Sequence, residues 1–452
     1  MLRKEDVMRR TLRGSLVMLS ATLTASVLLT ACGGGSSDSS GSSADPAPKP
    51  GEKIELNYWS WAPDMDKTVD VWNKSHPDIH VTVNKQDGGD PAVAKLLTAI
   101  KAGSGAPDVM QAEYQALPTM VAAGALADIK ADLPSDTQGH FADGVWNAVT
   151  LGTDAVYAVP QDSGPLMFYY RDDVFKKDGI KVPTTWDEYA AAAKTIHEKN
   201  PKQFLGTFSS NDPGWFAGLT QQNGASWWGV DGQSWSVNID SAESQKVASF
   251  WGNLVEQGVI DNTPMYTPGW NKALNNGTQV GWVSAVWAPG VLASNAPDTK
   301  GKWKAAPLPQ WDASAPATGN WGGSSTAVTS QSKHKAAAAE FAAWLNTSAD
   351  GVKALATISN VYPADTKNSA AALSQPPAFF ANQPDFYTVA AQVAGTAKSF
   401  TYGPDTNVAY SAYNDAFAKA AQSKKASAFT DALKTMQTTT LDDLKSSGYA
   451  AK

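Results

Sequence analysis

The sequence predicts an α/β fold in which helices cover a largely parallel sheet. The chain has 452 residues, of which 42% are hydrophobic and 17% are charged, as in globular proteins. Short segments with strand periodicity alternate with segments of helical periodicity, which is typical of an α/β layer. A chain of this length is long enough to form the hydrophobic cores of two or three domains.

The first elements lie between residues 54 and 103. Residues 54–58 (IELNY) alternate apolar and polar side chains, as a strand does, and residues 80–83 (HVTV) predict a second strand. Residues 66–74 between them predict a helix. A further helix is indicated by apolar residues at helical spacing, with Gly103 as a stop signal: Val93, Leu96, Leu97 and Ile100.

The same pattern continues downstream. Thr185 and Glu188 have the spacing of a capping box, which predicts a helix with Trp186, Tyr189 and Ile196 on its apolar side. An apolar helical stripe formed by Val247, Phe250, Trp251 and Leu254 stops at Gly258. Residues 279–287 predict a strand, residues 335–345 predict an Ala-rich helix, and the chain from residue 407 onward is expected to be largely helical. No internal repeat is present.

The N-terminus has the pattern of a secretion signal. Residues 1–31 hold five basic and two acidic residues, followed by an apolar run from about Leu16 to Leu29. The run is too short and too rich in Thr and Ser for a membrane span. It ends in the sequence LTACG, which resembles the lipobox of bacterial lipoproteins, so Cys32 is the predicted lipidation site. The alternative is an ordinary signal with an incidental cysteine.

The segment that follows predicts a flexible tether. Residues 32–52 contain almost nothing apolar, and a Gly/Ser-rich coil of this length spans on the order of 25 Å. Without residues 1–31 the chain carries a net charge of −10, which gives it no electrostatic reason to bind nucleic acid or an anionic membrane surface. The single cysteine excludes an internal disulfide.

Tryptophan is concentrated in the middle of the chain. Twelve of the 17 tryptophans lie between residues 166 and 321, and several follow Gly or Pro, where core packing does not require them: Trp227, Trp228, Trp270 and Trp321. For each of them alone, a contact role and a packing role are equally plausible. As a group they favour a binding surface, because tryptophan suits contacts that are partly apolar and partly polar.

Carbohydrates fit such a surface. A flat indole buries the apolar face of a sugar ring, and about 100 Å² of apolar area is worth roughly 2.5 kcal/mol. Hydrogen bonds from the sugar hydroxyls to a carboxylate add about 1.5–3 kcal/mol each.

Enzymatic functions find little support in the sequence. There is no GxSxG, HExxH or Walker A motif, and the five histidines lack the spacing of metal ligands. A glycosidase needs a pair of carboxylates, and no pair stands out among the acidic residues. We expect no catalytic residue, no cofactor and no metal.

Three segments resemble the bacterial extracellular solute-binding proteins of family 1, the sugar-binding type related to maltose-binding protein. They are residues 107–114 (PDVMQAEY), residues 156–165 (VYAVPQDSGP) and residues 321–323 (WGG), and their order and spacing agree over nearly all of residues 53–452. The resemblance implies a type II periplasmic-binding-protein fold, with two α/β lobes and a ligand cleft between them.

The same resemblance implies how the chain is divided. Crossings between the lobes are expected near residues 161–164 and 319–323. Lobe 1 takes residues 53–161 and 322–350, and lobe 2 takes residues 165–318 and 363–452.

It also implies the ligand contacts. Trp61 ends the first strand, Glu113 takes a position that is often Asp in relatives, and Asp162 lies in the first crossing. Trp282 departs from the pattern and is interpreted as a core residue. The remaining candidates are Trp287 and the second-crossing residues Trp321, Gly322 and Gly323, with Trp227, Trp228, Trp270 and Tyr362 as weaker ones.

By this resemblance the protein is expected to be a monomeric lipoprotein on the extracytoplasmic face of the cell membrane. It would bind a mono- or oligosaccharide by lobe closure and deliver it to the permease subunits of an ABC importer. The alternatives are a secreted carbohydrate-active enzyme or a sugar-binding module without a transport role. A peptide- or metal-binding importer subunit ranks third.

Overall fold

The computed structural model describes residues 51–231 and 234–452. The predicted signal (1–31), the predicted lipidation site Cys32 and the predicted tether up to residue 50 lie outside these residues. Among the described residues, no helix combines the length and apolar character that crossing a membrane requires.

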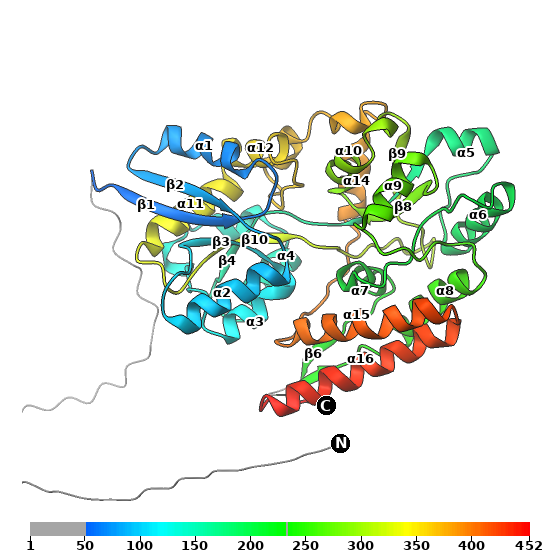
Figure 1. The fold of residues 1–452 in the computed structure, drawn as a ribbon. Helices are drawn as coiled ribbons and strands as arrows, with labels where there is room; N and C mark the ends of the chain where they lie inside the picture. Colours follow the sequence, from blue (N-terminus) through cyan, green and yellow to red (C-terminus); the bar gives the residue numbers. More distant parts are fainter. Residues whose placement is uncertain (1–50, 232–233) are drawn as a thin grey trace, which may run out of the picture. The chain divides into compact units, whose positions relative to one another are not determined.

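One part of the chain, called lobe 1 here, is built on a five-stranded sheet with the strand order β2-β1-β3-β10-β4. Helices α1 and α11 pack on one face of this sheet, α12 packs against both of them, and α2 and α3 lie on the other side (Figure 1). The bounds of the lobe 1 strands and helices are β1 (Ile54–Ser60), α1 (Met65–Ser75), β2 (Ile79–Lys85), α2 (Asp90–Ala102), β3 (Val109–Glu113), α3 (Leu117–Ala122), α4 (Asp143–Thr150), β4 (Ala158–Pro160), β10 (Ser324–Val328), α11 (Lys335–Thr347), α12 (Ala349–Thr357) and α13 (Ser369–Ala372).

Lobe 2 is built on a three-stranded sheet with the order β8-β5-β9, and it carries the long C-terminal helix pair α15 and α16, which packs on α7 and α8. The bounds of its strands and helices are β5 (Leu166–Arg171), α5 (Asp172–Asp178), α6 (Trp186–Lys199), α7 (Pro213–Gln222), β6 (Trp228–Asp231), β7 (Ser234–Val237), α8 (Ala242–Glu256), α9 (Pro268–Asn276), β8 (Gly281–Ala285), α10 (Ala288–Asn295), β9 (Trp303–Pro307), α14 (Phe386–Ala394), α15 (Thr406–Ser423) and α16 (Ala426–Ser446).

The predicted largely parallel sheet is only partly correct. Strands linked by a local helix are parallel, as β1 and β2 are. Each sheet also receives one strand that arrives from the other lobe, and that strand is antiparallel to both neighbours: β10 between β3 and β4, and β5 between β8 and β9. Strand–helix alternation reports only local connections, so it could not show these inserted strands.

Most local predictions are confirmed. Thr185 and Glu188 form the capping box at the start of α6, and Gly103 ends α2 with a left-handed φ of 76°. The predicted helix at residues 66–74 and the predicted helical C-terminus are present as α1, α15 and α16. The predicted strand at residues 279–287 is shorter, because Trp287 is the N-cap residue of α10.

The buried apolar residues of the described chain fall into two separate clusters, one in each lobe. The lobe 1 cluster joins the sheet to α1 and α11 through residues such as Trp72 and Phe341. The lobe 2 cluster is rich in aromatic residues and includes Trp215, Trp251 and Phe417. The fold is therefore the predicted two-lobed α/β architecture, with each lobe holding its own core.

Candidate functional site

Three chain segments join the two lobes and lie side by side. The first, residues 161–165, connects β4 to β5, and the second, residues 308–323, connects β9 to β10. The third, residues 358–385, leads from α12 of lobe 1 to α14 of lobe 2, with α13 packing back on α12. It pairs with the first through a bridge between Asp162 and Pro363. Crossings were expected near residues 161–164 and 319–323, and the expected lobe limits also imply a passage between residues 350 and 363. In the structure, the chain returns to lobe 2 only after α13.

The first two segments are held together by backbone hydrogen bonds. The N–H of Leu166 donates to the carbonyl of Gly319 at 2.9 Å, and the N–H of Trp321 donates to the carbonyl of Gly164 at 2.8 Å. A Cβ atom on Gly164 would lie only 2.1 Å from the carbonyl oxygen of Trp321. Gly164 is therefore required for the two crossings to approach each other this closely.

Asp162 is bound into the crossings by its side chain. Its carboxylate accepts a hydrogen bond from the backbone N–H of Ser324, and its backbone carbonyl accepts one from the hydroxyl of Tyr114 at 2.9 Å. Burial raises the pKa of Asp162 to about 6, and the hydrogen bonds from Ser324 partly oppose that rise. The structure thus places the Asp162 carboxylate against the second crossing, where it stabilises the junction.

Gly322 and Gly323 turn the second crossing into strand β10. Both have a left-handed backbone, with φ of 71° and 100°. A Cβ atom on Gly323 would lie 2.9 Å from the ring of Tyr114, and one on Gly322 would lie 3.7 Å from the indole nitrogen of Trp287. This turn therefore brings a lobe 1 ring and a lobe 2 ring to the same short segment.

On the lobe 1 side, Trp61 and Glu113 follow or end the neighbouring parallel strands β1 and β3. The backbone N–H of Trp61 donates to the side-chain oxygen of Gln111 at 3.2 Å. Both candidate side chains lie beside one loop, since a Cβ on Gly88 would be 3.1 Å from the Trp61 ring and one on Gly89 would be 3.7 Å from a Glu113 carboxylate oxygen. The carboxyl ends of parallel strands are where open α/β sheets bind ligands.

Glu113 also lies close to the second crossing in space, since it pairs with Ser324 in the sheet. The next residue, Tyr114, donates its backbone N–H to the carbonyl of Gly323 at 3.3 Å. The lobe 1 candidates are thus linked through Tyr114 to the segment that carries Trp321.

On the lobe 2 side, tryptophans pack edge to face. The ring centroids of Trp287 and Trp321 are 4.7 Å apart with an interplanar angle of 65°, and Trp282 lies 6.0 Å from Trp287 and 6.2 Å from Trp321. Trp282 is 2% exposed, which confirms its interpretation as a core residue, whereas Trp287 is only partly buried. Trp270 is 1% exposed and lies behind this group, 5.1 Å from Trp282.

The sequence analysis missed Tyr266. It is one of the few large apolar side chains that are exposed among the described residues, at 42%. Its ring lies 5.4 Å from Trp270 and 6.2 Å from Trp321, and its backbone has a φ of 64°. A Tyr with positive φ is uncommon, and no local sequence pattern predicts it.

Asp212 was also missed, because an Asp before a Pro at the start of a helix is an ordinary capping residue. It caps α7 by accepting the N–H of Trp215 at 3.1 Å. Burial raises its pKa to about 7, while hydrogen bonds from Trp215 and from the Trp321 side chain lower it. A carboxylate therefore lies against the ring of Trp321. Burial raises the pKa of Tyr266, and the negative charge of Asp212 raises it further.

Three of the weaker candidates lie elsewhere. Trp227 and Trp228 are almost fully buried in the lobe 2 core, where their indole N–H groups donate to Ser244 and Asp405 at 3.2 and 3.0 Å. Tyr362 belongs to the third crossing and stacks on Tyr387 at 6.3 Å. The structure does not bring these rings to the Trp287–Trp321 group, because packing within lobe 2 and at the crossing occupies them.

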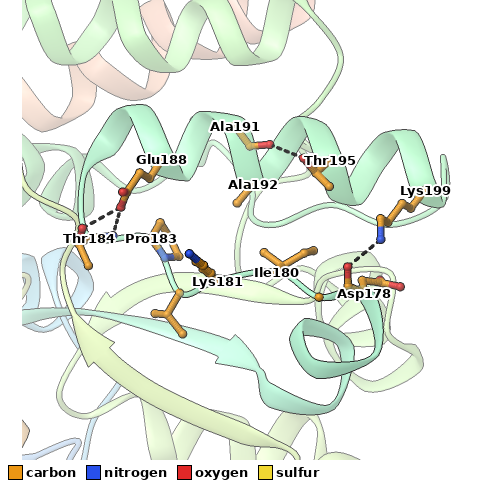
Figure 2. Close-up of a pocket in the computed structure, with 12 residues that line it drawn as sticks. Asp178, Ile180, Lys181, Pro183, Thr184, Glu188, Ala191, Ala192, Thr195 and Lys199 are labelled. Atoms are coloured by element: carbon orange, nitrogen blue, oxygen red, sulfur yellow. Dashed lines mark hydrogen bonds between the residues drawn. The ribbon is translucent and has the colours of Figure 1, made fainter.

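A surface cavity of about 620 Å³ lies apart from these residues, between the 178–184 turn and helix α6 (Figure 2). Its polar groups are engaged locally: Lys199 donates to the carbonyl of Asp178 at 2.7 Å, and Glu188 accepts from Thr184. None of the candidate residues lines this cavity. In the described part of the chain, no group of His, Cys, Asp and Glu residues is arranged to hold a metal ion.

Comparison with known families decides the assignment of this fold. Residues 50–352 match the model of the family described as bacterial extracellular solute-binding protein. The chain belongs to this family. The predicted family membership is confirmed, and the match spans most of lobe 1, the first two crossings and much of lobe 2.

Curated relatives of this solute-binding protein are sugar-binding proteins. It is 26% identical over 323 residues to the arabinooligosaccharide-binding protein of Halalkalibacterium halodurans, covering 67% of this chain and 70% of that one. It is 29% identical over 308 residues to the lactose-binding protein of Rhizobium radiobacter, covering 64% and 69%.

Solved structures of other binding proteins are similar in fold to this chain over most of its length. The galacto-N-biose/lacto-N-biose I-binding protein of an ABC transporter from Bifidobacterium longum, in complex with lacto-N-biose, superposes with a TM-score of 0.79. That match has 30% identity and covers 89% of this chain and all of that one. An ABC transporter binding protein from B. animalis subsp. lactis, in complex with β-1,6-galactobiose, gives a TM-score of 0.77 at 27% identity, with coverage of 89% and 100%.

Proposed function

We propose that this solute-binding protein captures a carbohydrate for an ABC importer. The observation that carries the proposal is the meeting of aromatic rings and carboxylates at the lobe crossings: Trp287 and Trp321 with Asp212 on the lobe 2 side, and Trp61 with Glu113 on the lobe 1 side. Rings supply apolar faces for sugar stacking, and carboxylates accept hydrogen bonds from sugar hydroxyls. The sugar-binding relatives support the same ligand class.

The proposed mechanism is closure of the lobes around the sugar. Closure is favoured only by a ligand that binds the closed form more tightly, and contacts to both lobes provide that difference. The lobes are expected to move as rigid bodies, because each has its own core, while the crossings absorb the backbone change. We assign Asp162 to holding the crossings together, and Glu113 and Trp287 to sugar contacts on opposite lobes.

The closed form would then be recognised by the permease subunits. We propose that the protein works as a monomer and returns its sugar chemically unchanged, without catalytic residues. Acylation of Cys32 would anchor it on the extracytoplasmic face of the membrane, and the Gly/Ser-rich segment after Cys32 would let the folded lobes reach the permease. We propose the lobe limits expected from the sequence, residues 53–161 with 322–350 and residues 165–318 with 363–452, with one change: lobe 1 also holds α12 and α13, and lobe 2 resumes after α13.

A sugar screen tests the proposal. The thermal midpoint of the protein is measured with lactose, lacto-N-biose, β-1,6-galactobiose, arabino-oligosaccharides and their monosaccharides. At least one carbohydrate is expected to raise the midpoint in a concentration-dependent way, since a ligand that binds only the native state stabilises it. Chromatography after prolonged incubation should recover that sugar intact, whereas cleavage products would favour the carbohydrate-active enzyme.

A further inference from the structure

Backbone pairing between strands β1 and β3 of lobe 1 stops before either strand ends. The last paired residues are Trp59 and Met110, although both strands continue beyond them. On its other side, β3 stays paired with β10 as far as Glu113, the partner of Ser324. The two parallel strands therefore separate at their carboxyl ends, which is where open α/β sheets bind ligands.

The side chain of Gln111 on β3 fills the gap that this separation leaves. It is 2% exposed, and its carbonyl oxygen accepts hydrogen bonds from the end of β1 and the turn after it. The Ser60 hydroxyl donates at 2.7 Å, and the backbone N–H groups of Trp61 and Ala62 both donate at 3.2 Å. Because interior backbone N–H groups require an acceptor, the amide of Gln111 fixes the path of the chain as it leaves β1.

The nitrogen of the same amide is bound to the crossings. Gln111 donates from Nε2 to the hydroxyl oxygen of Ser324 at 3.0 Å. The backbone N–H of Ser324 donates to the carboxylate of Asp162, and its carbonyl accepts the N–H of Gln161 at 2.8 Å. One buried amide thus joins the turn at Trp61 to the residues where the chain passes between lobes.

The proposed lobe 1 sugar contacts are placed relative to each other through this amide. Glu113 lies on the same strand as Gln111, two residues further on, and Trp61 lies in the turn that Gln111 holds. The Trp61 ring is only partly buried, with the loop at Gly88 on one side, where a Cβ would lie 3.1 Å from it. The position of the ring therefore depends on the turn.

We propose that Gln111 is a positioning residue of the sugar site, which holds the turn carrying Trp61 in a fixed place relative to Glu113 and the crossings. This inference rests on the proposed sugar-binding function and adds to it a buried residue that does not touch the sugar. Since the turn is fixed in advance, the Trp61 ring does not have to be ordered when the sugar binds, and less of the interaction energy is lost.

Three substitutions test the proposal. Gln111→Met keeps a side chain of similar length and removes both the acceptor and the donor. Gln111→Glu keeps an acceptor oxygen, and the Ser324 hydroxyl can rotate to donate to it. Gln383→Met is the matched control in lobe 2, because Gln383 is also buried and its amide also accepts from and donates to the chain, at Ala305, with distances of 2.8 and 2.9 Å.

Two measurements are made on each variant. Calorimetry gives the dissociation constant of a sugar that binds the wild type, such as lactose or lacto-N-biose. Fluorine NMR of protein labelled with fluorotryptophan reports on the Trp61 ring, whose resonance is identified by its absence in Trp61→Phe. The NMR measurement is made without sugar, so it tests the positioning of the ring independently of the proposed function.

Gln111→Met is expected to weaken sugar binding by about tenfold and to shift or broaden the Trp61 resonance, because the turn loses its acceptor. Gln111→Glu should bind within about threefold of the wild type and keep the Trp61 resonance near its wild-type position. Gln383→Met should lower the thermal midpoint, since it loses similar hydrogen bonds, and leave both the affinity and the Trp61 resonance unchanged.

A Trp61 resonance or a sugar affinity that Gln111→Met leaves unchanged would overturn the positioning role. An equal loss of affinity in Gln383→Met would also overturn it, since lowered stability alone would then explain the weaker binding. If Gln111→Met does not fold, Gln111→Asn takes its place, because its amide is one methylene too short to reach both partners. A wild type that binds no sugar would overturn the proposed function, while the Trp61 resonance would still decide whether Gln111 holds the turn.

Discussion

The indole N–H of Trp287 donates a 3.0 Å hydrogen bond to the backbone carbonyl of Trp321, and the two rings meet edge to face. Trp287 begins helix α10 of lobe 2, whereas Trp321 lies in the second crossing. This contact fixes the orientation of a partly buried ring at the point where the chain passes between lobes. A sugar stacked on Trp287 is therefore held close to the segment that must move if the lobes close.

Replacing Trp287 with Ala should weaken sugar binding. The loss of about 100 Å² of stacking area costs roughly 2.5 kcal/mol, or on the order of fiftyfold in affinity. Trp287→Phe keeps an aromatic face but lacks the N–H, so its loss should be smaller. Calorimetry measures both, and an unchanged dissociation constant for Trp287→Ala would remove Trp287 from the site.

Substitutions at Asp162 test whether this residue holds the crossings together (the junction role) or contacts the ligand. From the sequence alone, Asp162→Ala is expected to weaken binding and leave stability nearly unchanged. The hydrogen bond from Ser324 changes this expectation, because losing the acceptor leaves a buried N–H unpaired at a cost of about 1–3 kcal/mol. Asp162→Asn retains an acceptor oxygen and should unfold close to the wild type in urea. Equal stability of Asp162→Ala and the wild type would argue against the junction role.

Asp212 should make stability depend on pH. Burial raises its pKa to about 7, whereas an Asp in the unfolded chain titrates near pH ~3.9. The native state then binds more protons than the unfolded state between these values, so the unfolding free energy falls as pH rises from about 4 to about 7. Asp212→Asn cannot titrate and should show a flatter profile over this range. Parallel profiles of thermal midpoint against pH for the two proteins would contradict the raised pKa.

The anchor prediction concerns Cys32, outside the described residues. Cys32→Ser should abolish acylation and release the protein from the membrane fraction. The thermal midpoint of the released protein should not change, since residues 33–52 contain almost nothing apolar from which a core could form. Mass spectrometry of the protein from its native cell decides the matter: a free thiol at Cys32 would rule out the anchor.

Local sequence signals predicted local structure well. The Thr185–Glu188 capping box and the Gly103 stop depend on residues a few positions apart, and the structure contains both. Strand direction was predicted less well, because β5 and β10 find their partners only after the chain has crossed between lobes. No local pattern encodes that long-range pairing.

The same limit applies to the candidate site. Trp228 and Trp287 look alike in the sequence, yet Trp228 is buried against Asp405 and Trp287 keeps an accessible ring. Which ring stays open depends on residues far along the chain, such as Gly403, where any side chain would collide with Trp228. Conversely, Tyr266 was not predicted as a site residue although its side chain is exposed. Its exposure and positive φ arise from packing and not from a motif.

Small-angle X-ray scattering tests lobe closure most directly. The radius of gyration is measured without ligand and with a saturating concentration of a sugar that the thermal screen shows to bind. Closure about the three crossings predicts a smaller radius with sugar, and Trp287→Ala should need more sugar to reach it. A radius that stays the same within error at saturation would contradict closure and indicate a rigid site.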